Sequence, residues 1–224
     1  TRRYQQQAKT PLFISMDAEW GLGMRLDSCF SFPFNMTLGA VENDMLIYGM
    51  GEEIARQLKL LGVHINFAPV VDINNNPQNP VINSRSFGED KMAVTRKGIA
   101  FMKGLQDNGI IATAKHFPGH GDTDSDSHYT LPVITKNKMK LDSVELYPFR
   151  EMIRNGLESV MVAHLFVPSL DSMANTPTTL SRKVVTGLLQ KEMGFNGLVI
   201  TDALDMKGVT THYRPGEIEV KALM

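Results

Sequence analysis

The segment Lys115–His128 (KHFPGHGDTDSDSH) carries the densest group of chemically reactive side chains in the sequence. Its fourteen residues include three histidines, three aspartates, one lysine and three hydroxyl residues. It follows the apolar run Ile110–Ala114 (IIATA), which predicts a buried strand that delivers these groups at its end. A solvated loop has no need of so many titratable groups, so the segment is predicted to form part of a catalytic site.

Two parts of the chain have the chemistry of a proton donor and of a nucleophile. Asp126 and His128 are two residues apart in an expected loop, where the carboxylate can hydrogen-bond the imidazole and raise its basicity. Asp202 ends the apolar run Gly197–Asp202 (GLVITD), and burial at a strand end gives a carboxylate the fixed direction that a nucleophile needs. A carboxylate that faces a proton donor across a cleft is the general arrangement for glycoside hydrolysis.

Five apolar runs are predicted to form the strands that position these groups. They recur roughly every 40–50 residues and are apolar throughout, a pattern typical of repeated β/α units whose parallel sheet is covered on both faces. The runs are Leu12–Met16, Val63–Val71, Ile110–Ala114, Val160–His164 and Leu198–Asp202.

Polar residues stand where each run stops: Asp17, Asp72, Lys115–His116, His164 and Asp202. Convergence of such residues at the carboxyl ends of parallel strands is typical of a (β/α)8 TIM-type barrel. An open doubly wound sheet binds ligands at the same edge, but its Gly-rich phosphate turn is absent after the first run. The predicted fold class is therefore α/β, an incomplete barrel with five to six of the eight strands in this chain.

Helices are predicted between the runs, and four of them end in glycine, the preferred residue for the left-handed conformation that closes a helix. The helices are Ala40–Leu61, Asp90–Gln106, Asp142–Arg154 and Lys183–Met193. The closing glycines are Gly62, Gly109, Gly156 and Gly194.

Composition limits the classes of function. Apolar residues make up 42% of the 224 residues, charged residues 21%, and the net charge is −1, so nothing indicates binding to nucleic acid or to an anionic membrane. No run of about 18 apolar residues is present, and no membrane insertion is expected. The single cysteine, Cys29, excludes an internal disulfide framework and a multi-cysteine zinc site. Both a cytoplasmic and a periplasmic location are compatible with the sequence.

The motifs resemble those of the family 3 glycoside hydrolases, specifically the β-N-acetylhexosaminidase (β-N-acetylglucosaminidase) branch. The resemblance rests on KHFPGHGDTDSDSH and on the later VITDALDM. Supporting stretches are Asp17–Gly21 (DAEWG), Asn66–Asp90 (NFAPVVDINNNPQNPVINSRSFGED) and Met161–Asp171 (MVAHLFVPSLD). The match covers nearly the whole chain in the right order. It implies that residues 1–224 are a fragment of the single N-terminal barrel domain of that family, completed by further segments of the same polypeptide.

The resemblance implies a retaining double displacement. Asp202 matches the family nucleophile, His128 the general acid/base of this branch, and Asp126 the dyad partner of that histidine. The usual pair in glycosidases is two carboxylates, from which this branch departs. A histidine is physically suitable, because its unperturbed pKa near 6.5 lies close to a neutral operating pH.

The resemblance also implies a substrate. Asp17, Arg85, Lys115 and His116 match residues that hydrogen-bond the hydroxyls of a terminal, non-reducing β-linked N-acetylglucosamine. Arginine and lysine only donate and aspartate only accepts, which suits a ring of fixed hydroxyl groups. Peptidoglycan fragments are the expected source of this sugar, and neither a cofactor nor a metal is expected.

Several residues have a structural interpretation beside the functional one. Asp205 reads as a charge in the first turn of a helix, and His120, between two glycines, as a structural loop residue. His164 is as compatible with a buried, hydrogen-bonded core position as with a ligand contact. Asp72 is expected to tie down the loop Asn74–Pro77 through side-chain-to-backbone bonds.

Two further residues have competing interpretations. Without the family resemblance, Arg85 would be expected to form a solvated ion pair with Glu89 or Asp90. Trp20 can serve as a platform for the apolar face of a pyranose or can pack in the core.

Three other functions remain as alternatives. The same site could pass the sugar to phosphate as a phosphorylase, because a histidine repels phosphate less than a carboxylate would. A truncated barrel could be a non-catalytic sugar-binding fragment, since missing strands expose sheet edges. A metal-dependent hydrolase is the third, although neither H-x-H nor H-E-x-x-H spacing occurs on an expected strand or helix. Its ligands would come from His116, His120, Asp122, His128, His164 and Asp202.

Overall fold

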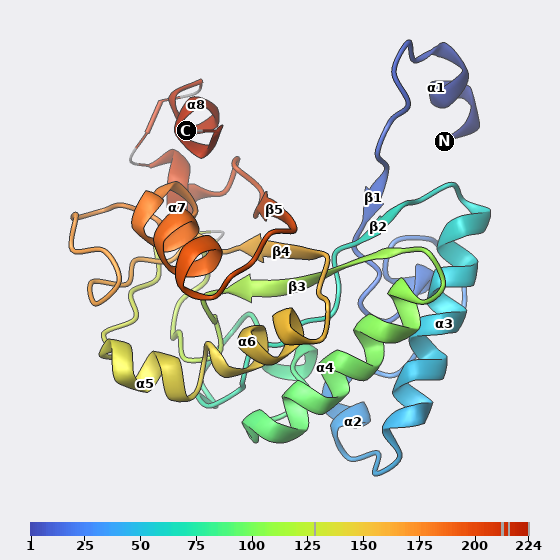
Figure 1. Cartoon of the computed structure of the whole chain (residues 1–224), viewed down its shortest axis with the longest axis horizontal. Coiled ribbons are helices and arrows are strands. Elements are labelled where there is room, and N and C mark those ends of the chain that lie inside the picture. Colours follow the sequence, from blue (N-terminus) through green and yellow to red (C-terminus); the bar gives the residue numbers. More distant parts are fainter. Residues whose placement is uncertain (128, 212, 215, 224) are drawn as a thin grey trace.

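The computed structural model describes residues 1–127, 129–211, 213–214 and 216–223. Its centre is a parallel sheet whose five strands follow one another in chain order, from β1 to β5 (Figure 1). The strands are β1 (Ser15–Met16), β2 (Ile65–Asn66), β3 (Ile111–Phe117), β4 (Ser159–Val162) and β5 (Leu198–Thr201). Each predicted apolar run overlaps one of these strands, which confirms the α/β class with a parallel sheet. The sheet of the described residues is curled and open, with β1 and β5 at its edges.

Helices cover the sheet between successive strands (Figure 1). The longest are α3 (Asp44–Leu60) and α4 (Lys91–Gln106). The shorter helices are α1 (Arg2–Gln7), α2 (Asn35–Gly39), α5 (Lys138–Ser143), α6 (Tyr147–Arg154), α7 (Lys207–Thr210) and α8 (Glu217–Leu223). Three single turns of 3-10 helix are η1 (Leu22–Met24), η2 (Asn83–Arg85) and η3 (Thr178–Leu180), and η4 (Lys183–Glu192) is a π-helix.

The predicted helix ends agree with the structure at the four glycines. Gly62, Gly109, Gly156 and Gly194 have φ values of 70°, 75°, 85° and 73°, the left-handed region that favours glycine. The prediction of one helix over Asp142–Arg154 is wrong, because the segment divides into α5 and α6. Pro148 lies in the first turn of α6, where its missing N–H is tolerated, and a proline inside a continuous helix would break the hydrogen-bond ladder.

The core lies between the sheet and the helices α3, α4 and α6. Leu58, Phe101 and Phe149 are fully buried against strand residues such as Ala114 and Val160. Close packing of α3 on α4 depends on Gly104, because a Cβ atom there would lie 2.2 Å from the carbonyl oxygen of Tyr48.

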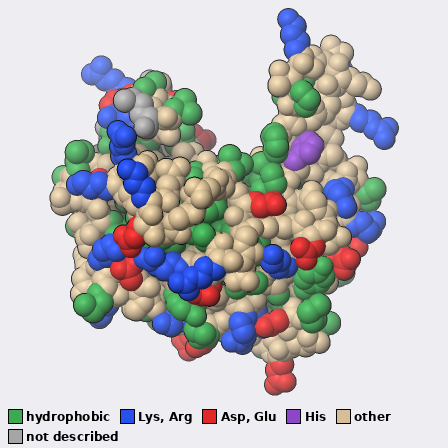
Figure 2. All heavy atoms as spheres, in the orientation of Figure 1, with side chains coloured by type: hydrophobic (Ala, Val, Ile, Leu, Met, Phe, Trp, Pro, Cys, Tyr) green, Lys and Arg blue, Asp and Glu red, His purple; other side chains and the backbone are tan. Residues whose placement is uncertain are grey.

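The surface in Figure 2 shows acidic and basic side chains mixed over the helices in the lower half of the molecule. An ion-pair network joins α5, α6 and η4, in which Lys138 and Arg150 both bond Asp142 and Glu192 at 2.7–3.1 Å. Among the described helices, none is both long enough and apolar enough to cross a membrane.

Candidate active site

A cavity of about 480 Å³ collects residues from the carboxyl ends of the strands. Asp17 follows β1, Lys115 and His116 lie near the end of β3, and Asp202 follows β5. The structure therefore brings these four residues together with Arg85 of η2, as expected for side chains at one edge of a parallel sheet. The cavity is lined by Asp17, Glu19, Met24, Arg25, Phe67, Val81, Arg85, Lys115, His116, His120, Ser127, Met161, Thr201, Asp202, Ala203 and Met206.

Asp17 is held between two cations. Its Oδ1 atom lies 2.8 Å from Lys115 Nζ, and its Oδ2 atom lies 2.6 Å from Arg25 Nη2. Burial acts to raise the pKa of Asp17, but the charges of Lys115 and Arg25 outweigh it and hold that pKa below its usual value. Asp17 is therefore an ionised acceptor at neutral pH. Arg25, eight residues further along the chain, had no role in the sequence-based prediction.

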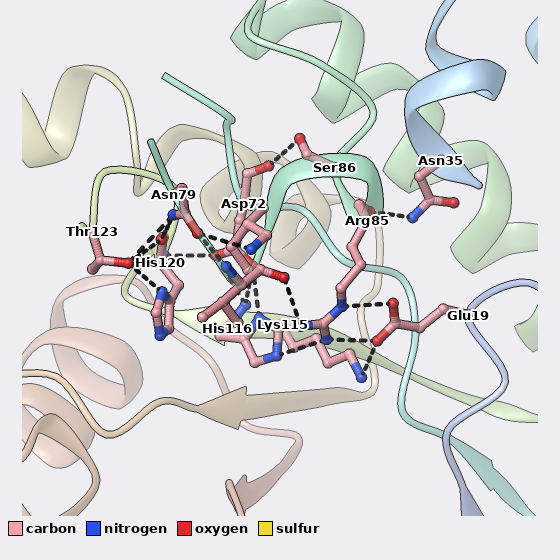
Figure 3. Close-up of polar contacts among 12 residues, drawn as sticks. Glu19, Asn35, Asp72, Asn79, Arg85, Ser86, Lys115, His116, His120 and Thr123 are labelled. Atoms are coloured by element: carbon pink, nitrogen blue, oxygen red, sulfur yellow. Dashed lines mark hydrogen bonds and ion pairs between the residues drawn. The ribbon is translucent and has the colours of Figure 1, made fainter. Parts of the chain in front are cut away.

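Glu19 is a second carboxylate of this network, and the sequence-based prediction missed it. It is 1% exposed and accepts two bonds from Arg85, Nη2 to Oε1 at 2.7 Å and Nε to Oε2 at 3.0 Å. Its Oε1 atom also lies 2.8 Å from Lys115 Nζ (Figure 3). Although burial opposes ionisation, these two cations lower the pKa of Glu19 to about 2. The signal was present in DAEWG, where two carboxylates stand two residues apart after a strand.

Arg85 does not form an ion pair with Glu89 or Asp90, its expected local partners. Asp90 instead caps α4, where its Oδ1 accepts from Ala93 N at 2.7 Å. The guanidinium turns inward from η2 to Glu19 and reaches within 3.4 Å of His116 Nε2. An interior carboxylate gives a stronger bidentate partner than a solvated one.

Asp72 supports the end of β3, and the prediction that it ties down the loop Asn74–Pro77 is wrong. It is buried, and its Oδ2 lies 2.7 Å from His116 Nδ1. It also accepts from the backbone N–H groups of His116 and His120, the latter at 2.7 Å. Burial acts to raise the pKa of Asp72, but these partners keep it below the usual value. Because arginine only donates, His116 Nε2 faces Arg85 as an acceptor, which assigns the proton on Nδ1 to the bond with Asp72.

Lys115 and His116 are adjacent and both line the cavity, although neighbouring residues of a regular strand point to opposite faces. The pairing register of β3 with β4 shifts between Ala114 and Phe117, so the strand is irregular at these two residues. Such an irregularity redirects side chains, and it is common next to active sites.

Asp202 faces the cavity from the turn after β5. Its N–H donates to Val162 O at 2.9 Å, and its Oδ1 accepts from Ala203 N at 2.8 Å. It forms no ion pair with any described residue, in contrast to Asp17 and Glu19. Asp205 is exposed and does not line the cavity; it also precedes α7 instead of lying in its first turn.

The predicted dyad can be located only in part, because His128 lies outside the described residues. The loop that contains Asp126 reaches the cavity, where Ser127 is one of the lining residues. Ser127 O accepts from Gly208 N at 3.1 Å, and a Cβ atom on Gly208 would lie 2.8 Å from that oxygen. This close contact fixes the loop against α7, near the turn that carries Asp202.

His164 and Trp20 do not line the cavity. His164 is fully buried, with Nδ1 2.5 Å from Thr179 Oγ1 and Nε2 2.9 Å from Ala203 O. It therefore supports the residue that follows Asp202. Trp20 is half-buried and packs edge-on against Phe34, with 4.6 Å between ring centroids.

No group of three or more His, Cys, Asp or Glu residues is placed to hold a metal ion in the described part of the chain. The alternative metal site included His128, which that part does not contain. Among the described residues, the cavity instead offers paired ions and one carboxylate, Asp202, that forms no ion pair.

Several known proteins are similar to this chain in sequence and in fold. The curated β-hexosaminidase A of Pseudoalteromonas piscicida is 38% identical over 97% of this chain. The solved family 3 β-N-acetylglucosaminidase of Paenibacillus sp. str. FPU-7 is 45% identical over 98% of the chain, with a TM-score of 0.94. A solved β-glucoside phosphorylase is 29% identical over 96% of the chain, with a TM-score of 0.90.

These relatives are longer than the present chain, which covers 39% of the Pseudoalteromonas protein, 42% of the Paenibacillus one and 40% of the phosphorylase. The profile of the glycosyl hydrolase family 3 N-terminal domain matches residues 1–224. The chain therefore belongs to glycosyl hydrolase family 3.

Proposed function

We propose that this protein is a retaining glycosidase that removes terminal, non-reducing β-linked N-acetylglucosamine, with peptidoglycan fragments as natural substrates. The observation that carries the proposal is the position of Asp202, a carboxylate without an ionic partner among the described residues, in the wall of the cavity that Asp17, Arg85 and Lys115 also line. The β-hexosaminidase and β-N-acetylglucosaminidase relatives support the choice of sugar.

The ion-paired residues are proposed to bind the sugar. Lys115 Nζ bridges Asp17 and Glu19, and Arg85 bridges Glu19 and His116, so donors and acceptors alternate along one wall of the cavity. Their mutual bonds fix their directions before a sugar enters. A preorganised wall binds hydroxyls with little loss of side-chain entropy.

The reaction is proposed to proceed in two displacements. An Asp202 carboxylate oxygen attacks the anomeric carbon, while His128 donates a proton to the departing glycosidic oxygen. A covalent glycosyl ester forms as the bond to the aglycone breaks. Water then attacks the same carbon, His128 takes up its proton, and Asp202 is released as a carboxylate. Asp126 is proposed to orient the histidine.

Further strands of the same polypeptide are proposed to close the sheet into a (β/α)8 barrel. β1 and β5 each pair with one neighbour in the described residues. Leu198 of β5 is 44% exposed, an apolar side chain at an open edge. The greater length of the relatives supports this proposal.

Intact mass after reaction with a slow fluorinated N-acetylglucosamine analogue tests the proposed function. A retaining mechanism gives an adduct of one glycosyl unit, and peptide mapping places it on Asp202. A protein that turns over substrate without any adduct, and inverts the anomeric configuration of the product, would not be a retaining glycosidase.

The proposed role of His128 as general acid predicts that the loss of rate on its removal depends on the leaving group of the substrate. In His128→Ala, hydrolysis of N-acetylglucosaminides with poor leaving groups should slow by about 10²–10⁴-fold, because such groups need a proton to depart. Aryl glycosides whose leaving group is a strongly acidic phenol need no general acid. The rate of their first displacement should therefore change little. The measurement is kcat/KM across a series of aryl and alkyl glycosides.

Asp124→Asn is a matched control for this series, because Asp124 is an exposed carboxylate of the same loop. Its rates should follow the wild-type protein for every leaving group. Equal losses in His128→Ala on good and poor leaving groups would remove His128 as the acid.

Water, not phosphate, is the expected acceptor. The three cations that line the cavity are each already paired, Arg25 with Asp17, Lys115 with Asp17 and Glu19, and Arg85 with Glu19. Together with Asp202, the carboxylates Asp17 and Glu19 equal these three cations in number, so a phosphate ion would meet no net positive charge from the described lining residues. We expect the rate to be independent of phosphate and the product to be the free sugar. A phosphate-dependent rate with release of a sugar 1-phosphate would instead make the protein a phosphorylase like its solved relative.

A further inference from the structure

The imidazole of His120 has a buried nitrogen without a partner. The residue is 1% exposed and lines the cavity, and its Nε2 atom forms no hydrogen bond with the described residues. A buried polar atom left without a partner costs about 1–3 kcal/mol. Seven buried side-chain atoms of the described residues lack a partner, and of the residues that carry them only His120 lines the cavity, where a ligand can supply one.

The rest of His120 is held firmly. Its backbone N–H donates to Asp72 Oδ1 at 2.7 Å, and its carbonyl accepts from Asn79 Nδ2 at 2.8 Å. Nδ1 lies 2.8 Å from Thr123 Oγ1 (Figure 3). The next residue, Gly121, packs so closely that a Cβ atom would lie 1.7 Å from Ile73 O. These contacts give the ring one position, and Nε2 is the nitrogen they leave available.

The ring is uncharged near neutral pH. Burial lowers the pKa of His120 to about 4. A neutral imidazole has one nitrogen that donates and one that accepts. Because Nδ1 is engaged by Thr123, Nε2 offers a single neutral hydrogen-bonding position. A hydroxyl group suits it in either tautomer, since a hydroxyl can both donate and accept.

We propose that His120 is a further substrate contact, whose Nε2 hydrogen-bonds one hydroxyl group of the sugar in the cavity. This rests on the proposed function, in which the ligand is N-acetylglucosamine. The centroid of the His120 ring lies 6.0 Å from that of His116, so one pyranose ring can reach both histidines. His120 thus has a structural role through its backbone and Nδ1, and a binding role through Nε2.

The test compares N-acetylglucosamine with its 3-, 4- and 6-deoxy derivatives as competitive inhibitors of the full chain. On the wild-type protein, the derivative that lacks the contacted hydroxyl should bind about tenfold more weakly than the parent sugar. The parent sugar should bind His120→Phe about tenfold more weakly than it binds the wild-type protein. The same deoxy derivative should bind the variant and the wild-type protein with equal affinity. Thr123→Val removes the bond to Nδ1 but keeps Nε2. This variant should therefore still bind the parent sugar about tenfold more tightly than the deoxy derivative.

A second measurement needs no substitution at the binding residue. In protein labelled with ¹⁵N-histidine, the Nε2 resonance of His120 should shift when N-acetylglucosamine is added, and shift less with the deoxy derivative identified above. If the parent sugar binds but this resonance does not move, and every derivative has the same penalty on the wild-type protein and on His120→Phe, the proposed contact is wrong. Failure of the parent sugar to bind the wild-type protein would instead contradict the proposed function.

Discussion

Asp202→Ala is expected to lower kcat by about 10⁴-fold or more on every substrate, whatever its leaving group. Asp202 lies in the cavity wall with its backbone bonded to Val162 and no ionic partner in the described residues, so its carboxylate is available for attack. Without it no glycosyl ester can form. This distinguishes Asp202 from His128, whose loss should spare activated substrates.

Azide provides the decisive measurement for Asp202→Ala. The anion can occupy the space that the carboxylate leaves and attack an activated aryl N-acetylglucosaminide from the same side. Rescue of turnover by azide, with a glycosyl azide of inverted anomeric configuration, is the expected result. Asp205→Ala is the matched control, because Asp205 is an exposed carboxylate three residues away. Equal losses in the two variants, or no rescue and no adduct, would exclude Asp202 as the nucleophile.

Glu19→Gln is expected to cost about 3–5 kcal/mol of unfolding free energy at pH 7, because it leaves Arg85 with a neutral partner inside the protein and Lys115 with Asp17 as its one remaining carboxylate among the described residues. The depressed pKa of Glu19, about 2 against an ordinary 4.5, corresponds to about 3 kcal/mol, which agrees. The same change frees Arg85 to move, so KM for the sugar should rise as well. Denaturant unfolding and steady-state kinetics measure the two effects.

The effect of Glu19→Gln should depend on pH in a defined direction. A carboxylate with a depressed pKa stabilises the folded state fully above pH 4.5, and this contribution disappears as the pH falls towards 2. The difference between wild type and variant should therefore shrink as the pH is lowered from 7 to 3. Glu42→Gln, at an exposed carboxylate, is the control and should change little at either pH. A difference that is the same at pH 7 and pH 3 would mean that packing, not charge, accounts for the loss.

Residues at strand ends were predictable from the sequence. Asp17, Lys115, His116 and Asp202 each follow or end an apolar run, and parallel strands bring such residues to one edge of the sheet. The runs and their common direction are sufficient to place these residues. Which charged groups touch one another does not affect that placement.

Pairings between distant residues were not predictable in this way. Glu19 and Arg85 are 66 residues apart, and the nearby Glu89 and Asp90 were the obvious partners by sequence. Asp72 was expected to bond its own loop, yet it bonds His116, 44 residues away. In each case a buried partner across the sheet is preferred to a solvated local one, because a charge-assisted bond is stronger where water is excluded.

The sequence by itself determined the repeated β/α units, the glycines that end the helices and the strand-end positions of the polar residues, because these depend on local periodicity and backbone preference. Only the tertiary structure decided how Lys115–His128 is used. Its first two residues enter a network with Asp17, Glu19, Arg85 and Asp72, and His120, which lines the cavity, is pinned with Nε2 unpartnered among the described residues. These arrangements arise from the curl of the sheet and the irregularity of β3, which bring together charges that are far apart in the chain.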